Sequence, residues 1–180
     1  GNVEGRKHAL EILEAGLQAA DPYHNTKRLL AVHGNRLYIG FPDFVPEGSP
    51  RTGTDVYDLD KDLDRIFVFG AGKGIQRVAE ALEEILGNRL TGGLILLKHH
   101  DEHHLGRIQV FFGGHPVPDE GCVNGCREMV KMIRACKLTS RDLVFTILGN
   151  GASSLLTLPW EDLNLEDVKA VTQILQIEQG

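Results

Sequence analysis

RIFVFGAGKGIQRVAEALEEILG, residues 65–87, is the stretch of sequence that decides the fold. It begins with the apolar run 66–69, which is rich in β-branched and aromatic side chains and is typical of a buried strand. Gly70-Ala71-Gly72 then allows the backbone to turn sharply, and Lys73 follows the turn. Over residues 75–86, apolar side chains recur at helical spacing. The stretch therefore predicts a strand, a glycine turn and a helix, with a lysine where the strand gives way to the helix.

Strands and helices continue to alternate after this stretch. Further strands are expected at 93–98, 107–112 and 143–148, and further helices at 119–137 and 165–179. This order predicts an α/β fold with a mainly parallel sheet and helices on its faces. The connection 99–106 is too short for a helical crossover, so we expect the strand at 107–112 to be antiparallel or to lie elsewhere in the sheet.

The first 60 residues follow a different pattern. They predict helices at 3–20 and 22–30, a hairpin of residues 30–33 and 36–40 around a Gly-Asn turn, a loop at 41–54 and a short strand at 56–59. We therefore divide the chain into an N-terminal cap, residues 1–60, and a main α/β domain, residues 61–180. The last helix has no closing strand after it, so we expect the chain to be the N-terminal part of a longer protein.

Composition limits the class of protein. The 180 residues suffice for one domain with a sizeable core, and a net charge of −6 argues against nucleic acid as a partner. No apolar run approaches the roughly 20 residues needed to span a membrane. The three cysteines fall in one predicted helical segment, which favours reduced thiols and a cytoplasmic location.

Three glycine-bearing loops follow predicted strands: GAGK at 70–73, GGHPVPDE at 113–120 and GNGASS at 149–154. In a parallel sheet such loops meet at one edge, where open α/β sheets bind their ligands. Backbone N–H groups together with a lysine suit phosphate or carboxylate binding and phosphoryl transfer. The simpler alternatives are a tight turn with a solvated lysine and, in the last loop, a serine that caps the next segment.

Standard motifs do not describe these loops. A Walker A loop requires a serine or threonine after its lysine, but Gly74 follows Lys73. A dinucleotide-binding fingerprint that starts at Gly70 would need a glycine in place of Ile75. A nucleophile elbow in the last loop would need a glycine in place of Leu155. The sequence therefore gives little support to a classical P-loop, an NAD site or an α/β-hydrolase.

The order of several short motifs resembles the glycerate 2-kinase family, the type with a C-terminal MOFRL domain. These motifs are AADP, FVFGAGK, ALEEILG, GGHPVPDE, LTLP and LEDVKAVT, which extend over most of the chain. The resemblance implies a Rossmann-like three-layer sandwich and a kinase that uses ATP and Mg²⁺ to phosphorylate the 2-hydroxyl of D-glycerate. It also implies an active site between this domain and a second one, so we expect this chain to be inactive alone. The lysine of the family's GAGK motif corresponds to Lys73 in this chain.

Two departures from the family pattern fall in the presumed ligand loops. The family usually has a serine, three glycines and a serine after the fourth strand, whereas GNGASS carries an extra residue. After GAGK the family continues with small residues, whereas this chain has the bulkier Gly74-Ile75-Gln76-Arg77. The substrate is therefore either glycerate or another hydroxy acid or sugar acid.

The candidate site residues come from the three loops. We assign Lys73 a catalytic role, in which it neutralises a carboxylate or a phosphoryl group or assists proton removal; its alternative is an exposed lysine. Ligand-binding roles for ATP or substrate are assigned to Gly70, Gly72, Gly149, Asn150, Gly151, Ser153 and Ser154. His115 and Asp119 are assigned to the substrate, with a loop-pinning hydrogen bond and a helix cap as their alternatives.

Other polar residues have simpler interpretations. The run His99-His100-Asp101-Glu102-His103-His104 is expected to be a solvated loop, because zinc sites need ligands at defined spacing. Cys122 and Cys126 are expected to be packing residues, and Trp160 is expected to pack against the core.

Two functions compete with a kinase. One is a hydroxypyruvate or tartronate reductase, a name attached to relatives of the family, although the dinucleotide fingerprint fails. The other is a non-catalytic module that binds a small anion or mediates assembly. Apolar surface on the hairpin and on the last helix is compatible with a homodimer, and we expect neither a nucleic acid nor a membrane as partner.

Overall fold

A four-stranded parallel sheet forms the centre of the computed structural model, which describes residues 2–40 and 53–178. The strands lie in the order β6-β5-β4-β7, with bounds Ile108–Gly113 for β6, Leu90–Lys98 for β5, Arg65–Ala71 for β4 and Asp142–Leu148 for β7. All three neighbouring pairs are parallel. The carboxyl ends of the strands therefore meet at one edge, as the sequence predicts.

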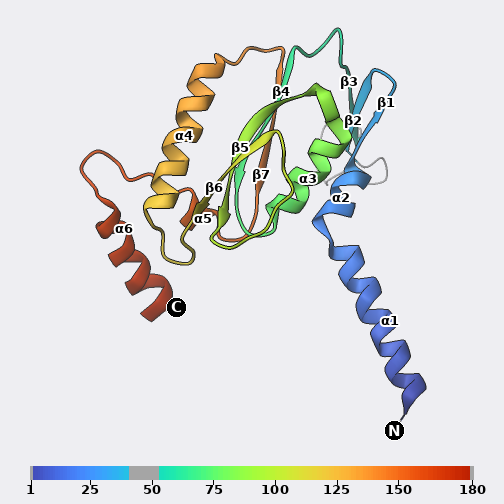
Figure 1. Cartoon of the computed structure of the whole chain (residues 1–180), viewed down its shortest axis with the longest axis horizontal. Coiled ribbons are helices and arrows are strands. Elements are labelled where there is room, and N and C mark those ends of the chain that lie inside the picture. The colour runs from blue at the N-terminus through green and yellow to red at the C-terminus, as the bar shows by residue number, and fades with distance from the viewer. Residues whose placement is uncertain (1, 41–52, 179–180) are drawn as a thin grey trace.

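Helices cover both faces of this sheet (Figure 1). On one face Val68 packs in a core with α3, Ile75–Leu86. On the other face Phe67 and Phe69 pack in a second core with α4, Glu120–Cys136, and the short α5, Ala152–Leu155. Successive residues of β4 thus enter opposite cores, because side chains alternate across a strand. The predicted α/β sandwich is confirmed.

The direction of β6 corrects the expectation for the third strand. β6 runs parallel to β5, with Gly93 opposite Ile108 and Lys98 opposite Gly113. The connection between them contains a turn and no helix, and residues 99–107 are enough to return along β5, because a chain can cover about 3.3 Å per residue. Glu83 of α3 holds the returning chain by accepting the N–H groups of Gly106, Arg107 and Ile108.

The N-terminal residues form a second, smaller sheet. Its order is β1-β2-β3 and its strands are antiparallel. The elements are α1 at Val3–Ala20, α2 at Pro22–Leu29, β1 at Leu30–His33, β2 at Arg36–Gly40 and β3 at Thr54–Asp58. Leu37 is fully buried in the core that contains α3, whereas α1 has no buried residue and projects from the molecule (Figure 1). Most of the predicted loop at 41–54 lies outside the described residues.

Two helical segments end the described part of the chain: α6, Leu165–Thr172, and a wider helical turn, Gln173–Glu178. Asn164 caps α6 by accepting the N–H groups of Glu166 and Asp167. The prediction for Trp160 is wrong, because this side chain is 76% exposed. In the described part of the chain, none of the helices has both the length and the apolar character needed to cross a membrane.

Candidate anion-binding site

The loops after β4 and β7 are joined by backbone hydrogen bonds. The Lys73 N–H donates to the Asn150 carbonyl at 2.8 Å, and the Gly149 N–H donates to the Ala71 carbonyl at 3.0 Å. The Gly72 N–H donates to the Leu96 carbonyl on the next strand at 3.1 Å. The structure therefore brings the GAGK and GNGASS loops together at the carboxyl edge of the sheet, as expected for a parallel sheet.

Close approach of these two loops explains the glycines in them. A Cβ on Gly70 would lie 1.9 Å from the Ile147 carbonyl oxygen, and a Cβ on Gly72 would lie 2.5 Å from the backbone of Gly149. Gly72 also has φ +141°, a conformation that favours glycine. A Cβ on Gly149 would lie 2.8 Å from the Lys73 carbonyl oxygen. These three positions are fixed by contacts between neighbouring chain segments, and the same contacts position Lys73.

The third loop, residues 114–119, packs against the GNGASS loop. The buried Ser154 hydroxyl donates to the Gly114 carbonyl at 3.0 Å. The peptide bond between His115 and Pro116 is cis. The His115 ring lies against Gly151, because a Cβ on Gly151 would be 2.5 Å from His115 Cδ2. Because Gly151 is the N-cap residue of α5 and no side chain caps that helix, the alternative in which Ser153 or Ser154 is a cap is wrong.

Asp119 has a structural role that the sequence also indicated. It is the N-cap of α4, where its carboxylate accepts the Cys122 N–H, and it lies 2.6 Å from His99 Nε2. Burial by itself raises the pKa of Asp119, but hydrogen bonds from His99 and from the Gly114 and Cys122 N–H groups lower it to about 2. The helix-cap interpretation is confirmed, and the carboxylate is engaged by these donors.

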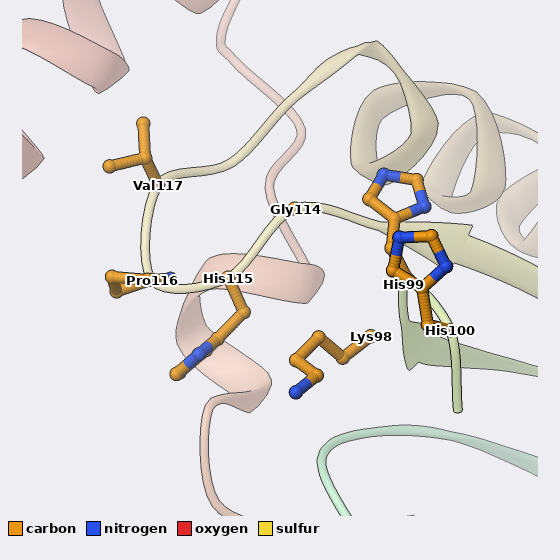
Figure 2. A pocket seen from close by; sticks show the side chains of 7 residues that line it. All are labelled: Lys98, His99, His100, Gly114, His115, Pro116 and Val117. Atoms are coloured by element: carbon orange, nitrogen blue, oxygen red, sulfur yellow. The ribbon is translucent and has the colours of Figure 1, made fainter.

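An open pocket of about 390 Å³ lies beside this loop, and Figure 2 shows its lining. The lining residues are Lys98, His99, His100, Gly114, His115, Pro116 and Val117. Lys98, the last residue of β5, extends towards His115 (Figure 2). Burial lowers the pKa of His115 below its ordinary value, and the positive charges of Lys73 and Lys98 lower it further. Two ammonium groups and an imidazole therefore share one electrostatic environment.

The chemistry of this lining suits an anion. None of the lining residues is a carboxylate, and Mg²⁺ is bound in proteins through carboxylates and substrate phosphates. Among residues 2–40 and 53–178, no group of at least three His, Cys, Asp or Glu side chains could hold a metal ion. The pocket therefore fits a carboxylate or phosphoryl group and does not fit a bare divalent cation.

Lys98 is the site residue that sequence reasoning missed. It belongs to no glycine loop, and the sequence analysis treated it only as the end of the strand GLILLK. Its position offered a usable signal, because a lysine at the carboxyl end of a buried parallel strand lies at the ligand-binding edge.

The cysteines, and the histidines after His100 in the 99–104 run, do not line this pocket. His99 contacts Asp119, whereas the backbone N–H of His104 is held by Glu80 on α3. Cys122 and Cys126 are buried in the core beside α4, which confirms that they are packing residues. Burial, together with Cys122, raises the pKa of Cys126 to about 11, so its thiol stays protonated at neutral pH.

Comparisons with known proteins agree with the motif resemblance. Glycerate 2-kinase from Pyrococcus horikoshii is 28% identical over 94% of this chain and 34% of its own length. D-glycerate 2-kinase from Thermotoga maritima is 33% identical over 86% of this chain and 35% of its own length. A relative from Agrobacterium vitis that is 32% identical over 63% of this chain and 29% of its own length bears the name "Putative hydroxypyruvate reductase". The chain thus spans about a third of the length of the curated glycerate 2-kinases it matches.

Solved structures and a family model lead to the same group of proteins. The crystal structure of a protein from Pyrococcus horikoshii OT3 matches with a TM-score of 0.74 and 27% identity, over 94% of this chain and 34% of that one. The family model described as "Domain of unknown function (DUF4147)" matches residues 8–179. The predicted likeness to glycerate 2-kinases is confirmed by the named relatives. The chain therefore belongs to the DUF4147 family.

Proposed function

We propose that this chain is part of a kinase that uses ATP and Mg²⁺ to phosphorylate the 2-hydroxyl of D-glycerate or a related hydroxy acid. The observation that carries the proposal is geometric: hydrogen bonds join the GAGK, GNGASS and 114–119 loops at the carboxyl edge of the sheet, where Lys98 and His115 line a pocket. The names of the relatives support the reaction, and the identity of the substrate rests on those names. Because the chain spans about a third of these relatives, we propose that it is inactive alone.

Lys73 neutralises negative charge in this reaction. Phosphoryl transfer depends on positioning and charge stabilisation more than on covalent chemistry of the protein. The Lys73 side chain is exposed, and its backbone is held by Asn150, so its ammonium group starts from a fixed anchor and can reach a bound phosphoryl group. Asn150 and Ser153 are exposed beside it and supply further donors. ATP, when bound, would supply the phosphoryl group, and Mg²⁺ would enter with the phosphates of ATP, because the described lining offers it no carboxylate.

The direct test uses the complete protein that contains this chain. It is incubated with ATP, Mg²⁺ and a panel of hydroxy acids that includes D-glycerate, and ADP and the phosphorylated acid are measured. We expect 2-phosphoglycerate to form, and we expect Lys73→Met to lower kcat at least about 100-fold, the usual effect of removing one charge-stabilising group. Lys131→Met is the matched control, because Lys131 lies on the outer face of α4 and pairs with Glu128.

Other outcomes are equally informative. Turnover of a different acid would keep the reaction and change the substrate, whereas near-normal kcat in the Lys73 variant would remove Lys73 from the mechanism. The name of the Agrobacterium vitis relative favours a second candidate, reduction of hydroxypyruvate. A nicotinamide absorbance assay with hydroxypyruvate separates the two, because only the reductase consumes the reduced cofactor.

A further inference from the structure

Lys98 and Lys73 occupy matching positions at the carboxyl ends of adjacent strands: Lys98 is the last residue of β5, and Lys73 lies two residues beyond the end of β4. Ala71 of β4 lies opposite Leu96 of β5, and each lysine comes two residues after this pair. Because side chains alternate along a strand, Lys98 lies on the same face as Leu96, which packs in the core beside α4. The loop that carries His115 leads into α4, so Lys98 faces that loop (Figure 2).

Lys98 has a positive charge that the described residues do not balance. Within residues 2–40 and 53–178, its ammonium group forms no ion pair with a carboxylate. Asp119, at the other end of the 114–119 loop, is already engaged by His99 and by the start of α4. The Lys98 residue is half-buried, and a partly desolvated charge is unfavourable unless an opposite charge meets it. The pocket beside Lys98 leaves room for such a group from a ligand.

We propose that Lys98 binds the carboxylate of the hydroxy-acid substrate, which leaves Lys73 for the transferred phosphoryl group. This inference rests on the proposed function and names the residue that selects an acid as the acceptor. The pocket volume of about 390 Å³ lies near the lower end of the range of roughly 300–1,000 Å³ for ligand sites, which fits a short hydroxy acid. Pro116 and Val117 provide carbon surface for its short chain.

The first test compares an acid with its neutral amide in the complete protein. For Lys98→Met we expect KM for D-glycerate to rise roughly 10–100-fold, because a hydrogen bond to a charged group is lost. KM for ATP should stay within about twofold. D-glyceramide, which lacks the negative charge, should be used equally well by the wild type and the variant. Lys98→Arg keeps the positive charge and should restore much of the preference for the acid.

Kinetic results of another kind would overturn the assignment. An unchanged KM for D-glycerate in Lys98→Met would do so, and so would a loss of kcat with both KM values intact, since that would place Lys98 at the phosphoryl group. Lys131→Met serves again as the control for net charge, and thermal unfolding of each variant checks that the fold is retained.

A binding measurement separates this inference from the proposed function. Isothermal titration calorimetry with D-glycerate and then with each acid of the panel, without ATP, needs no turnover. If no acid is phosphorylated, yet the wild type binds an acid and Lys98→Met binds it at least about tenfold more weakly, the kinase proposal fails and the carboxylate site stands. If the wild type binds none of the acids, or if the variant binds them equally well, the inference is overturned.

Discussion

The two ends of the β4–β7 strand pair differ in how they use charge. At the amino end, Arg65 forms two hydrogen bonds to Asp142, at 2.8 and 2.7 Å. Beside it Arg141 forms two to Asp64, at 2.9 and 2.7 Å. At the carboxyl end the two strands are followed by loops joined through backbone groups, and Lys73 has no carboxylate partner among the described residues.

This contrast separates stability from ligand binding within one sheet. Paired guanidinium and carboxylate groups hold the amino ends together and leave no net charge for a ligand. At the carboxyl ends, glycines and not ion pairs allow the close packing. The lysines there therefore have no carboxylate partner among the described residues. A parallel sheet makes this division natural, because all its carboxyl ends lie at the edge where ligands bind. Changes at the two ends should therefore have different consequences.

The largest effect is expected from Gly72→Ala at the carboxyl end. The new Cβ would lie 2.5 Å from the backbone of Gly149, and φ at this position is +141°. We expect a loss of about 3 kcal/mol in the free energy of unfolding, from strain and overpacking together. Urea unfolding measures it, and activity should fall too, because the two loops separate.

Gly74→Ala is the matched control for this prediction. Gly74 also has a positive φ, +81°, but a Cβ there would meet nothing within 4 Å. We expect a smaller loss of about 1–2 kcal/mol, which is the cost of the left-handed conformation alone. Equal losses in the two variants would show that contact between the GAGK and GNGASS loops does not matter.

A smaller effect, which diminishes at acid pH, is expected from Asp142→Asn at the amino end. The hydrogen bonds from Arg65 hold the pKa of Asp142 well below its ordinary value, against the effect of burial, and the Thr139 N–H and hydroxyl groups lower it further. A lowered pKa contributes stability that is complete above the ordinary pKa of about 3.9 and is lost as pH falls towards the native pKa. The wild type should therefore lose stability below about pH 4.

Urea unfolding at pH 7 and pH 3 measures this contribution. Asp142→Asn should be less stable than the wild type at pH 7, and it should lose less stability on going to pH 3. Asp64→Asn is the comparison, because the Asp64 side chain is 54% exposed, and exposed ion pairs contribute little. An unaltered acid response in Asp142→Asn would mean that the Arg65 pair does not stabilise the amino end.

Local patterns in the sequence predicted the elements of both ends. A continuous apolar run identified β4, and apolar residues at helical spacing identified α3. The glycine loops could also be located from the sequence, because the close backbone approach at Gly70 and Gly72 admits only glycine.

Contacts between distant residues explain what the sequence did not predict. The direction of β6 depends on Glu83, which holds the returning chain from another helix. Lys98 lowers the pKa of His115 only because the fold brings the loop that carries His115 close to the end of β5. Trp160 lies in a segment where no periodic pattern indicates which side faces the core, and it is exposed. Such contacts have no signature at short sequence spacing.

The smallest effect is expected at Ser154, which joins two of the loops. Its hydroxyl donates to the Gly114 carbonyl at 3.0 Å, and the residue is 8% exposed. Ser154→Ala should lower the free energy of unfolding by about 1 kcal/mol, the net contribution of one hydrogen bond. Ser153→Ala, one residue earlier and exposed, should leave the free energy of unfolding within about 0.5 kcal/mol of the wild type. If Ser154→Ala also raises KM for the hydroxy acid while kcat stays constant, the loop that carries His115 is positioned by this hydrogen bond. If KM is unchanged, the glycine contacts position the loop by themselves, and the carboxyl edge needs no side-chain hydrogen bond to hold its shape.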